Sequence, residues 1–353
     1  MGKQALITGI TGQDGAYLAK YLLKKKYKVF GLYRRSSTPN FWRLQNLDIF
    51  NEISFIPGDL CDMGSLIEAI KISNPDEIYN LGAQSFVGAS YEQAKFSTEV
   101  NGLGPLRFLE AIRSINKSIK FYQASTSEMY GNSIKAKDQI LSEDSRMEPI
   151  SPYAASKLYG FNSVCIYREG YDIYAVNGIL FNHESPLRGL EFVTRKVTNE
   201  VAKIVNGLSD EIVLGDMNSK RDWGYAPEYV EAMWKMLQQD TPDDFVISTG
   251  ETHSVEELVD VAFRAAGINN YGKYIKTNKQ YYRPTDINVL IGDASKANKT
   301  LDWKAKIKFK ELIELMVKSD ISNWSKYLDG NIFPWDAPNY PSEANILTRV
   351  IKH

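Results

Sequence analysis

Cysteine and histidine are scarce in this chain. Its 353 residues include two cysteines, Cys61 and Cys165, and three histidines, and none of them forms a Cys-x-x-Cys pair or a His-rich tract. Two isolated thiols cannot supply the disulfide framework of a small secreted protein, and so few soft ligands do not make a zinc-binding pattern. We therefore expect neither a disulfide framework nor a bound metal.

Strong charge and long apolar runs are also absent. The formal net charge is −1 at neutral pH, so we expect no overall attraction to nucleic acid or to an anionic membrane. No apolar run reaches the length of about 18 residues that a membrane span needs. With 43% hydrophobic residues, the chain can bury the cores of two domains. We expect a cytoplasmic protein that binds neither nucleic acid nor membrane.

The N-terminal residues have the pattern of a dinucleotide-binding unit. An apolar run at 4–8 precedes a glycine-rich segment, after which Leu18 and Leu22 recur at helical spacing. Glycines at such a turn let the backbone approach a pyrophosphate beside the helix N-terminus, so we expect the segment to bind a dinucleotide. It consists of Gly9, Ile10, Thr11, Gly12, Gln13, Asp14 and Gly15.

The end of the second expected strand indicates which dinucleotide binds. The strand covers residues 28–33, and Arg34, Arg35, Ser36 and Ser37 follow it. A chain that binds NAD offers a carboxylate at this point to the ribose hydroxyls, whereas guanidinium and hydroxyl groups suit the 2′-phosphate of NADP. The predicted cofactor is therefore NADP.

Two later segments carry groups that can transfer protons. Tyr153 and Lys157 are four residues apart, so on a helix they share one face, where the ammonium can favour the phenolate and make tyrosine a usable base. Thr126 and Glu128 are two residues apart, which puts both on one side of an extended segment. These four side chains are predicted to remove two protons from a bound substrate.

Apolar periodicity alternates between strand and helix up to about residue 181. This alternation predicts a doubly wound, mostly parallel α/β sheet of the Rossmann type, with a second, smaller α/β domain after it. Ser151-Pro152 is typical of an N-cap and a first-turn proline, so a helix should begin there. Expected strands lie near 4–8, 28–33, 53–56, 77–82, 119–124 and 174–180, and expected helices near 15–25, 63–72, 100–114, 153–169, 194–207, 254–266 and 309–322.

These motifs occur together in one known group of enzymes. The chain resembles the extended short-chain dehydrogenase/reductases, and within them the GDP-mannose 4,6-dehydratase family, over nearly its whole length. The Tyr153/Lys157 pair identifies only the superfamily, whereas Thr126-Ser127-Glu128 and the runs 182–186 and 192–196 point to the dehydratase branch. Matching segments are 8–15, 34–37, 58–60, 81–85, 125–131, 153–157, 180–186, 192–196 and 221–224.

The resemblance implies roles for individual residues and for whole segments. The catalytic residues would be Thr126, Glu128, Tyr153 and Lys157. Further cofactor-binding residues would be Asp59, Leu60, Leu81, Gly82, Ala83, Gln84, Ser85, Lys157, His183 and Arg188. Substrate-binding residues would be Ser85, Thr126, Glu128, Asn182, Lys196, Arg221, Arg283 and Asp286. The NADP-binding domain would contain 1–181 and about 222–248, and the substrate domain about 182–221 and 249–353. The resemblance also implies a homo-oligomer, either a dimer or a tetramer.

The implied reaction converts GDP-D-mannose to GDP-4-keto-6-deoxy-D-mannose. Tyr153 would take a proton from a sugar hydroxyl while its carbon gives hydride to NADP+, and Glu128 would take the proton at C5 before the C6 hydroxyl leaves as water. The hydride then returns at C6, which makes the enzyme a hydro-lyase. Ser127 stands where related dehydratases of thymidine-linked glucose have aspartate, so Glu128 would serve as both base and acid.

Three positions depart from the pattern of this family. Asp286 stands where glutamate is common, Phe96 where tyrosine is common, and Asn101 where aspartate is common. These changes keep a second substrate open, GDP-D-glycero-D-manno-heptose, by the same mechanism. Two other classes also remain open: a GDP-ketosugar reductase or epimerase, which would not need Glu128, and a silent scaffold that binds NADP without turnover.

Overall fold

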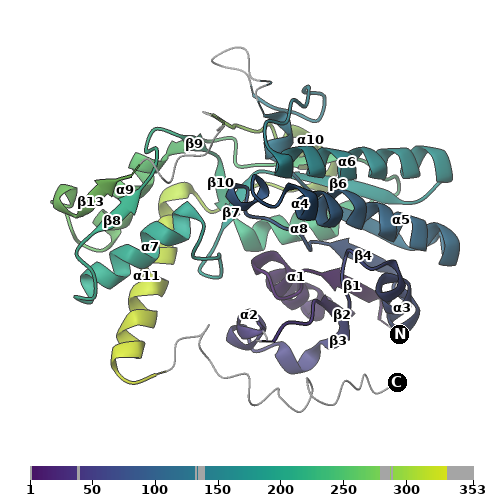
Figure 1. Cartoon of the computed structure of the whole chain (residues 1–353), viewed down its shortest axis with the longest axis horizontal. Coiled ribbons are helices and arrows are strands. Elements are labelled where there is room, and N and C mark those ends of the chain that lie inside the picture. The colour runs from purple at the N-terminus through teal and green to yellow at the C-terminus, as the bar shows by residue number, and fades with distance from the viewer. Residues whose placement is uncertain are drawn as a thin grey trace.

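A seven-stranded parallel sheet forms the centre of the molecule (Figure 1). The computed structural model describes residues 2–37, 40–131, 133, 140–278, 287 and 289–331. Every strand pairing in this sheet is parallel, and the strand order is β11-β6-β5-β4-β1-β2-β3. The strands are β1 (Gln4–Thr8), β2 (Lys28–Tyr33), β3 (Ser54–Pro57), β4 (Glu77–Asn80), β5 (Lys120–Thr126), β6 (Ala175–Leu180) and β11 (Phe245–Ile247).

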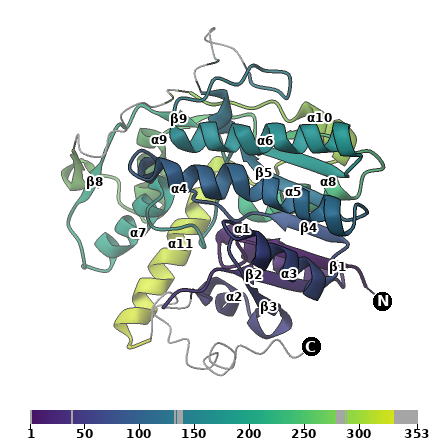
Figure 2. The ribbon, with the colours of Figure 1, turned by 45° about the vertical axis from the view of Figure 1, so that its right-hand side comes forward.

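Helices cover both faces of the sheet (Figure 2). On one face, α1 (Gln13–Lys24) packs with α8 (Ala226–Leu237), and Leu18, Leu22 and Met233 are fully buried between them and the sheet. The other face carries a second apolar core, to which Leu6 and Phe108 belong. The predicted doubly wound α/β fold is therefore confirmed. This second face is covered by α3 (Met63–Ser73), α5 (Gly104–Ile115) and α6 (Pro152–Tyr171).

The chain changes direction across the sheet at β1. β2 and β3 lie on one side of β1, whereas β4, β5 and β6 follow on the other side. The carboxyl ends of β1 and β4 therefore border the kind of crevice in which doubly wound sheets bind ligands. Gly9, after β1, has a φ of +65°, and a Cβ there would lie 2.8 Å from the backbone nitrogen of Gly82 after β4. Only glycine suits this conformation at such a close approach.

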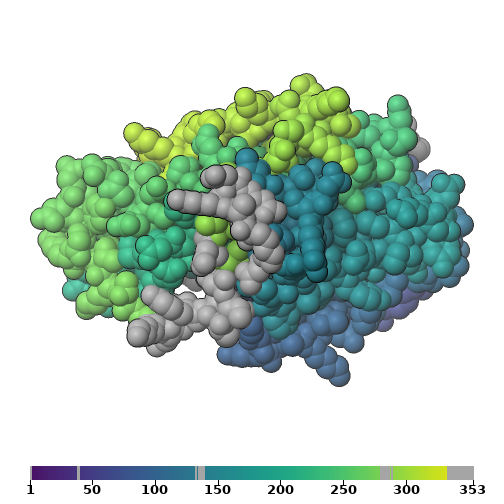
Figure 3. Space-filling view, turned by 90° about the horizontal axis from the view of Figure 1, so that it is seen from above, coloured from purple at the N-terminus to yellow at the C-terminus, as the bar shows by residue number. Residues whose placement is uncertain are grey.

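A second, smaller body follows the sheet (Figure 3), and it has its own core. It contains α7 (Val193–Val205), α9 (Val255–Ala265) and α11 (Phe309–Leu328), which pack on one another. Its two-stranded sheets are β7 (Asn182–Glu184) with β10 (Trp223–Tyr225), β9 (Lys220–Arg221) with β12 (His253–Ser254), and β8 (Ile212–Leu214) with β13 (Ile275–Thr277). We propose that the two bodies correspond to the two domains expected from the sequence, except that β10, expected in the first domain, pairs with β7 of the smaller body. No helix among the described residues is both long and apolar enough to cross a membrane.

Two local expectations are wrong. The helix expected at 100–114 begins earlier, because α4 (Ala94–Thr98) continues through a π-helical turn, Glu99–Leu103, into α5. Glu128 does not lie on an extended segment, since β5 ends at Thr126, where its pairing with β6 also ends. The next residues, Ser127–Tyr130, form a 3-10 turn, and the Glu128 amide donates to the Thr126 hydroxyl at 3.3 Å. The short helices α2 (Trp42–Asn46) and α10 (Ser295–Leu301) were not predicted.

Candidate active site

The first turns of α6 hold Tyr153 and Lys157. As predicted, Ser151 is the N-cap, with its hydroxyl accepting from the Ala154 amide at 3.1 Å, and Pro152 is the first helical residue. Tyr153 and Lys157 are one turn apart and both buried. Lys157 Nζ donates to the carbonyl of Ala124 in β5 at 2.8 Å, so the lysine is anchored to the end of the neighbouring strand.

Burial dominates the proton affinities of these two groups. It raises the pKa of Tyr153 to about 12, although interaction with the Thr126 hydroxyl lowers it, and the charge of Glu128 adds to the increase. Burial lowers the pKa of Lys157 to about 8, against the opposing effect of Asp14. Nζ of Lys157 is 5.9 Å from the centre of the Tyr153 ring. Lys157 bonds to the Ala124 carbonyl in this arrangement, and burial decides the direction of the Tyr153 pKa shift, so the support of the tyrosinate by Lys157 stays a prediction.

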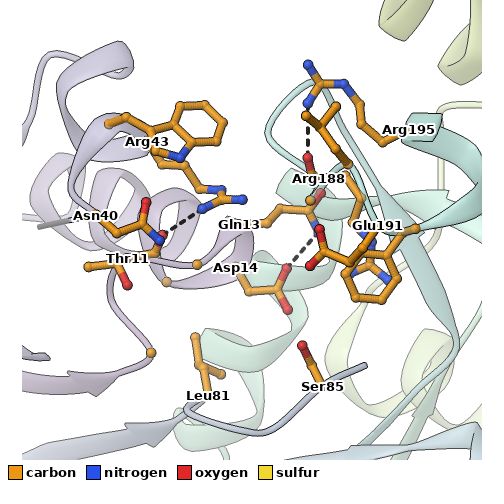
Figure 4. Close-up of a pocket in the computed structure, with 17 residues that line it drawn as sticks. Thr11, Gln13, Asp14, Asn40, Arg43, Leu81, Ser85, Arg188, Glu191 and Arg195 are labelled. Carbon is orange, nitrogen blue, oxygen red and sulfur yellow. Dashed lines mark hydrogen bonds between the residues drawn. The ribbon is translucent and has the colours of Figure 1, made fainter. Parts of the chain in front are cut away.

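The glycine turn and the start of α1 border a first cavity, of about 530 Å³ (Figure 4). α1 begins at Gln13, and its N-cap, Gly12, has no side chain to satisfy the first amides of the helix. These amides and the positive end of the helix suit an anion such as a pyrophosphate. Of the residues predicted for the cofactor, those lining this cavity are Gly9, Thr11, Gly12, Gln13, Asp14, Leu81, Ser85 and Arg188.

A second cavity, of about 320 Å³, lies at the ends of β1, β2 and β4. Arg34 lines it, whereas Arg35, Ser36 and Ser37 are exposed and line neither of these two cavities. Ile10 is fully buried in the core. The structure thus places one of the two predicted arginines beside the cavity. The other predicted residues that line it are Gly9, Thr11, Asp59, Leu60, Gly82, Ala83 and Gln84.

His183 and Asp14 form a pair that joins β7 to the first turn of α1. Nε2 of His183 lies 2.8 Å from Oδ2 of Asp14, and Nδ1 lies 2.8 Å from the carbonyl oxygen of Phe181. Burial alone would lower the histidine pKa, but the carboxylate outweighs it and the pKa is raised. Burial alone would raise the Asp14 pKa, yet the histidine holds it at about 2. Both groups are therefore charged over a wide range of pH.

A third cavity, of about 650 Å³, brings together residues predicted for the substrate. Glu128, Asn182, Lys196 and Arg221 all line it, although they come from four separate segments. Arg221 is buried, and its Nη1 donates to the carbonyl of Ile287 at 2.7 Å. Ser85, Thr126, Tyr153 and Lys157 do not line this cavity. Arg283 and Asp286 lie outside the residues that the structure describes.

Some residues of the site were not predicted from the sequence. Arg43 lines the first cavity, and its Nε and Nη1 donate to the carbonyls of Leu187, at 2.7 Å, and Thr11, at 3.1 Å. Burial lowers its pKa to about 10. Glu191 lines both the first and the third cavity. Figure 4 shows Arg43 and Glu191 across the cavity from one another.

The arrangement can bind a dinucleotide beside a second, charged ligand, and its side chains can exchange protons with that ligand. The first and second cavities share the glycine turn, and the first and third share Glu191 and Phe192. The third cavity has both cations, Lys196 and Arg221, and a carboxylate, Glu128, that can act as a base. Such a layout suits a reaction on a phosphorylated substrate beside a nucleotide cofactor.

Comparison with known proteins identifies the family. The family profile described as GDP-mannose 4,6 dehydratase matches residues 6–316. The chain is 48% identical over 343 residues to a GDP-mannose 4,6 dehydratase of Drosophila melanogaster, covering 90% of this chain and 86% of that protein. It is 47% identical over 348 residues to the Homo sapiens protein of the same name, covering 91% and 93%. The structure of dTDP-glucose 4,6-dehydratase from Bacillus anthracis in complex with NAD superposes with a TM-score of 0.80 at 21% identity, covering 92% of this chain and 98% of that chain. The chain therefore belongs to the GDP-mannose 4,6-dehydratase family.

Proposed function

We propose that this protein is a GDP-mannose 4,6-dehydratase, an NADP-dependent hydro-lyase that forms GDP-4-keto-6-deoxy-D-mannose and water. The main support is that Glu128 reaches the third cavity together with Asn182, Lys196 and Arg221. Lys157 donates to the Ala124 carbonyl of β5, the strand that leads to Glu128. The names of the relatives that are 47–48% identical over about nine tenths of the chain agree with this activity.

The residues around the first two cavities fit NADP. The uncapped start of α1, at Gly12, offers backbone amides to a pyrophosphate, and Gly9 and Gly82 leave the strand ends free of side chains. Arg34 borders the second cavity and would bind a 2′-phosphate through charge-assisted hydrogen bonds. When bound, NADP+ supplies the hydride acceptor of the oxidation and the donor of the later reduction.

The chain itself supplies the proton transfers. Tyr153, beside Thr126, takes the proton of the sugar hydroxyl at C4, and the ammonium of Lys157 supports the tyrosinate. A ketone at C4 makes the proton at C5 acidic, and Glu128 removes it. Because Ser127, the neighbouring residue, is not an acid, Glu128 also returns a proton to the hydroxyl that leaves from C6. One carboxylate therefore serves as base and then as acid.

Two departures from the family pattern do not bear on the choice of sugar. Phe96 lines the second cavity and not the third. Asn101 is buried, and its Oδ1 accepts from the Gln84 amide at 2.9 Å, in the loop that borders the second cavity. Both residues lie on the cofactor side, so we keep GDP-mannose as the proposed substrate in preference to GDP-D-glycero-D-manno-heptose. The predicted homo-oligomer is a further proposal, which light scattering of the purified protein tests.

The test is incubation of the purified protein with NADP+ and either GDP-mannose or the GDP-heptose, followed by mass spectrometry. We expect loss of one water from GDP-mannose. Loss from the heptose alone would keep the mechanism and change the substrate. No loss from either would reject the proposal.

Glu128→Gln separates a dehydratase from a reductase or epimerase of GDP-ketosugars. The amide cannot accept the C5 proton, so water loss should fall by about 10²–10⁴-fold. Glu169→Gln, an exposed position on the same helix as Lys157, is the matched control and should behave like the parent. Activity that survives Glu128→Gln would favour the reductase or epimerase.

A further inference from the structure

Four central strands carry a row of polar side chains, which stand at the last residues of β1 and β4 and inside the longer strands β5 and β6. Thr8, Asn80, Gln123 and Asn177 are in register with one another on β1, β4, β5 and β6. All four are buried, with at most 2% of their surface exposed. Two positions earlier on each strand, the same face carries the apolar residues of the core under α3, α5 and α6. These residues are Leu6, Ile78, Phe121 and Ala175.

Hydrogen bonds join the first three of these residues, Thr8, Asn80 and Gln123, into one chain with a defined direction. The Gly82 amide donates to the Thr8 hydroxyl at 2.8 Å, and that hydroxyl donates to Oδ1 of Asn80 at 2.7 Å. Nδ2 of Asn80 donates to Oε1 of Gln123 at 2.7 Å, and Nε2 of Gln123 donates to the Ala124 carbonyl at 3.0 Å. The chain therefore begins at the cofactor loop, because Gly82 lines the second cavity.

The last acceptor of this chain is also the anchor of the catalytic lysine. Lys157 Nζ donates to the same Ala124 carbonyl at 2.8 Å, so the lysine and the Gln123 amide share one oxygen. A buried amide without hydrogen-bond partners destabilises a fold, and apolar side chains would be enough for packing at this level of the sheet. The polar row is thus best explained by its position between the Gly82 loop and the Ala124 carbonyl that anchors Lys157.

We propose that Gln123 is a positioning residue for Lys157. Gln123 completes a hydrogen-bonded row from the Gly82 loop to the Ala124 carbonyl and thereby fixes the lysine beside Tyr153. The proposal rests on the function proposed above, in which Lys157 supports the tyrosinate. The row also explains how the cofactor loop and the catalytic helix keep one relative position, although they follow different strands.

The test is Gln123→Glu. It keeps the size of the side chain and the acceptor for Asn80, but it replaces the donor to Ala124 by a carboxylate oxygen. We expect kcat to fall by about tenfold, because the anchor of Lys157 is displaced, while the Kd for NADP changes by less than about twofold. In the parent, the charge of Asp14 raises the pKa of Lys157, and the new carboxylate at position 123 would raise it further. The alkaline limb of the pH profile should therefore move upward by about one pH unit.

Two further variants test whether the row acts as a chain. Asn80→Asp removes the donor to Gln123 one step farther from Lys157, so it should lower kcat by less than Gln123→Glu. Ser163→Ala is the matched control, since Ser163 is buried on α6 and donates to the Tyr159 carbonyl at 2.9 Å, outside the row. It should leave kcat and the pH profile as in the parent.

The pKa of Lys157, followed by NMR with isotope-labelled lysine, gives a readout that does not need turnover. It should rise in Gln123→Glu. If that variant does not fold, Gln123→Met should lower kcat similarly without the rise. A folded Gln123→Glu with the parent's kcat, pH profile and Lys157 pKa would overturn the proposal. A parent protein that loses no water from either GDP-sugar would instead reject the proposed function, while the NMR result would still decide the role of Gln123.

Discussion

The two halves of the active site are built in different ways. On the cofactor side, the functional groups follow the ends of strands that belong to one seven-stranded sheet, so the sheet sets their spacing. On the substrate side, Asn182 and Arg221 lie on strands of three and two residues, and Lys196 lies in the first turn of α7. The first side depends on a ladder of backbone hydrogen bonds. The second depends on short two-stranded pairings and on single contacts such as that of Arg221 with the Ile287 carbonyl.

This difference predicts where each half is vulnerable. A sheet of paired strands tolerates the loss of one side chain, because the backbone ladder remains. The smaller body has short strands, and a buried ion pair between α7 and α11 helps to hold it: Arg195 Nη2 lies 2.5 Å from Oδ1 of Asp320, and both side chains are 1% exposed. Nη1 of Arg195 also donates to the carbonyl of Arg188, at 2.9 Å, next to the first cavity.

The largest effect is expected from Asp320→Asn. The change removes the carboxylate that pairs with the buried guanidinium of Arg195, and it weakens the bond that Asp320 accepts from the Thr198 hydroxyl at 2.7 Å. Removing one member of a buried pair costs about 3–5 kcal/mol, so the free energy of unfolding should fall by that amount. Urea unfolding measures it, with the exposed Asp329→Asn at the end of the same helix as control. A loss no greater than in the control would mean that the smaller body does not depend on this pair.

A substitution on the cofactor side should change the affinity for the cofactor alone. Arg34 lines the second cavity and Arg35 does not, so Arg34→Gln should weaken NADP binding by about tenfold and NAD binding hardly at all. Arg35→Gln should cause a smaller loss. Titration of the purified protein with each dinucleotide, followed by fluorescence, gives both dissociation constants. Equal losses for NAD and NADP in Arg34→Gln would show that the arginine does not bind the 2′-phosphate.

The matching substrate-side change is Lys196→Gln. Lys196 lines the third cavity, so its loss should raise the KM for GDP-mannose by about tenfold while the Kd for NADP and kcat stay near those of the parent. Lys203→Gln, two turns later on α7 and paired with Glu200, is the control. A change in NADP affinity would instead indicate that the two halves of the site are coupled through the residues they share.

Sequence patterns predicted local features better than features that depend on contacts between distant segments, for physical reasons. β1 and β2 have the predicted bounds, because a buried parallel strand is a local apolar run, and the N-cap Ser151 is likewise a local signal. The 3-10 turn at Glu128 was missed because β5 ends where its partner β6 ends, which is decided by a distant segment. Arg43 was missed because α2 has only five residues and shows no period. The pair of Arg195 and Asp320 joins positions 125 residues apart, and no local pattern reports such a contact.

The smallest effect is expected at the junction of the two halves, where Asp14 of α1 meets His183 of β7. The Asp14 pKa is lowered to about 2, so its contribution to stability is present above its ordinary pKa and is lost as the pH falls through about 2. The His183 pKa is raised, so its contribution is present below its ordinary pKa, about 6.5, and is lost as the pH rises through the higher value. The pair therefore stabilises the fold most between about pH 4 and 6.5. His183→Gln keeps a hydrogen-bond donor without the charge, and it should lower stability by about 1 kcal/mol in this window and by less at pH 9. Melting curves from pH 4 to 9 measure the difference, and a deficit that does not change with pH would mean that the histidine acts as a neutral donor and that no charge joins the two halves.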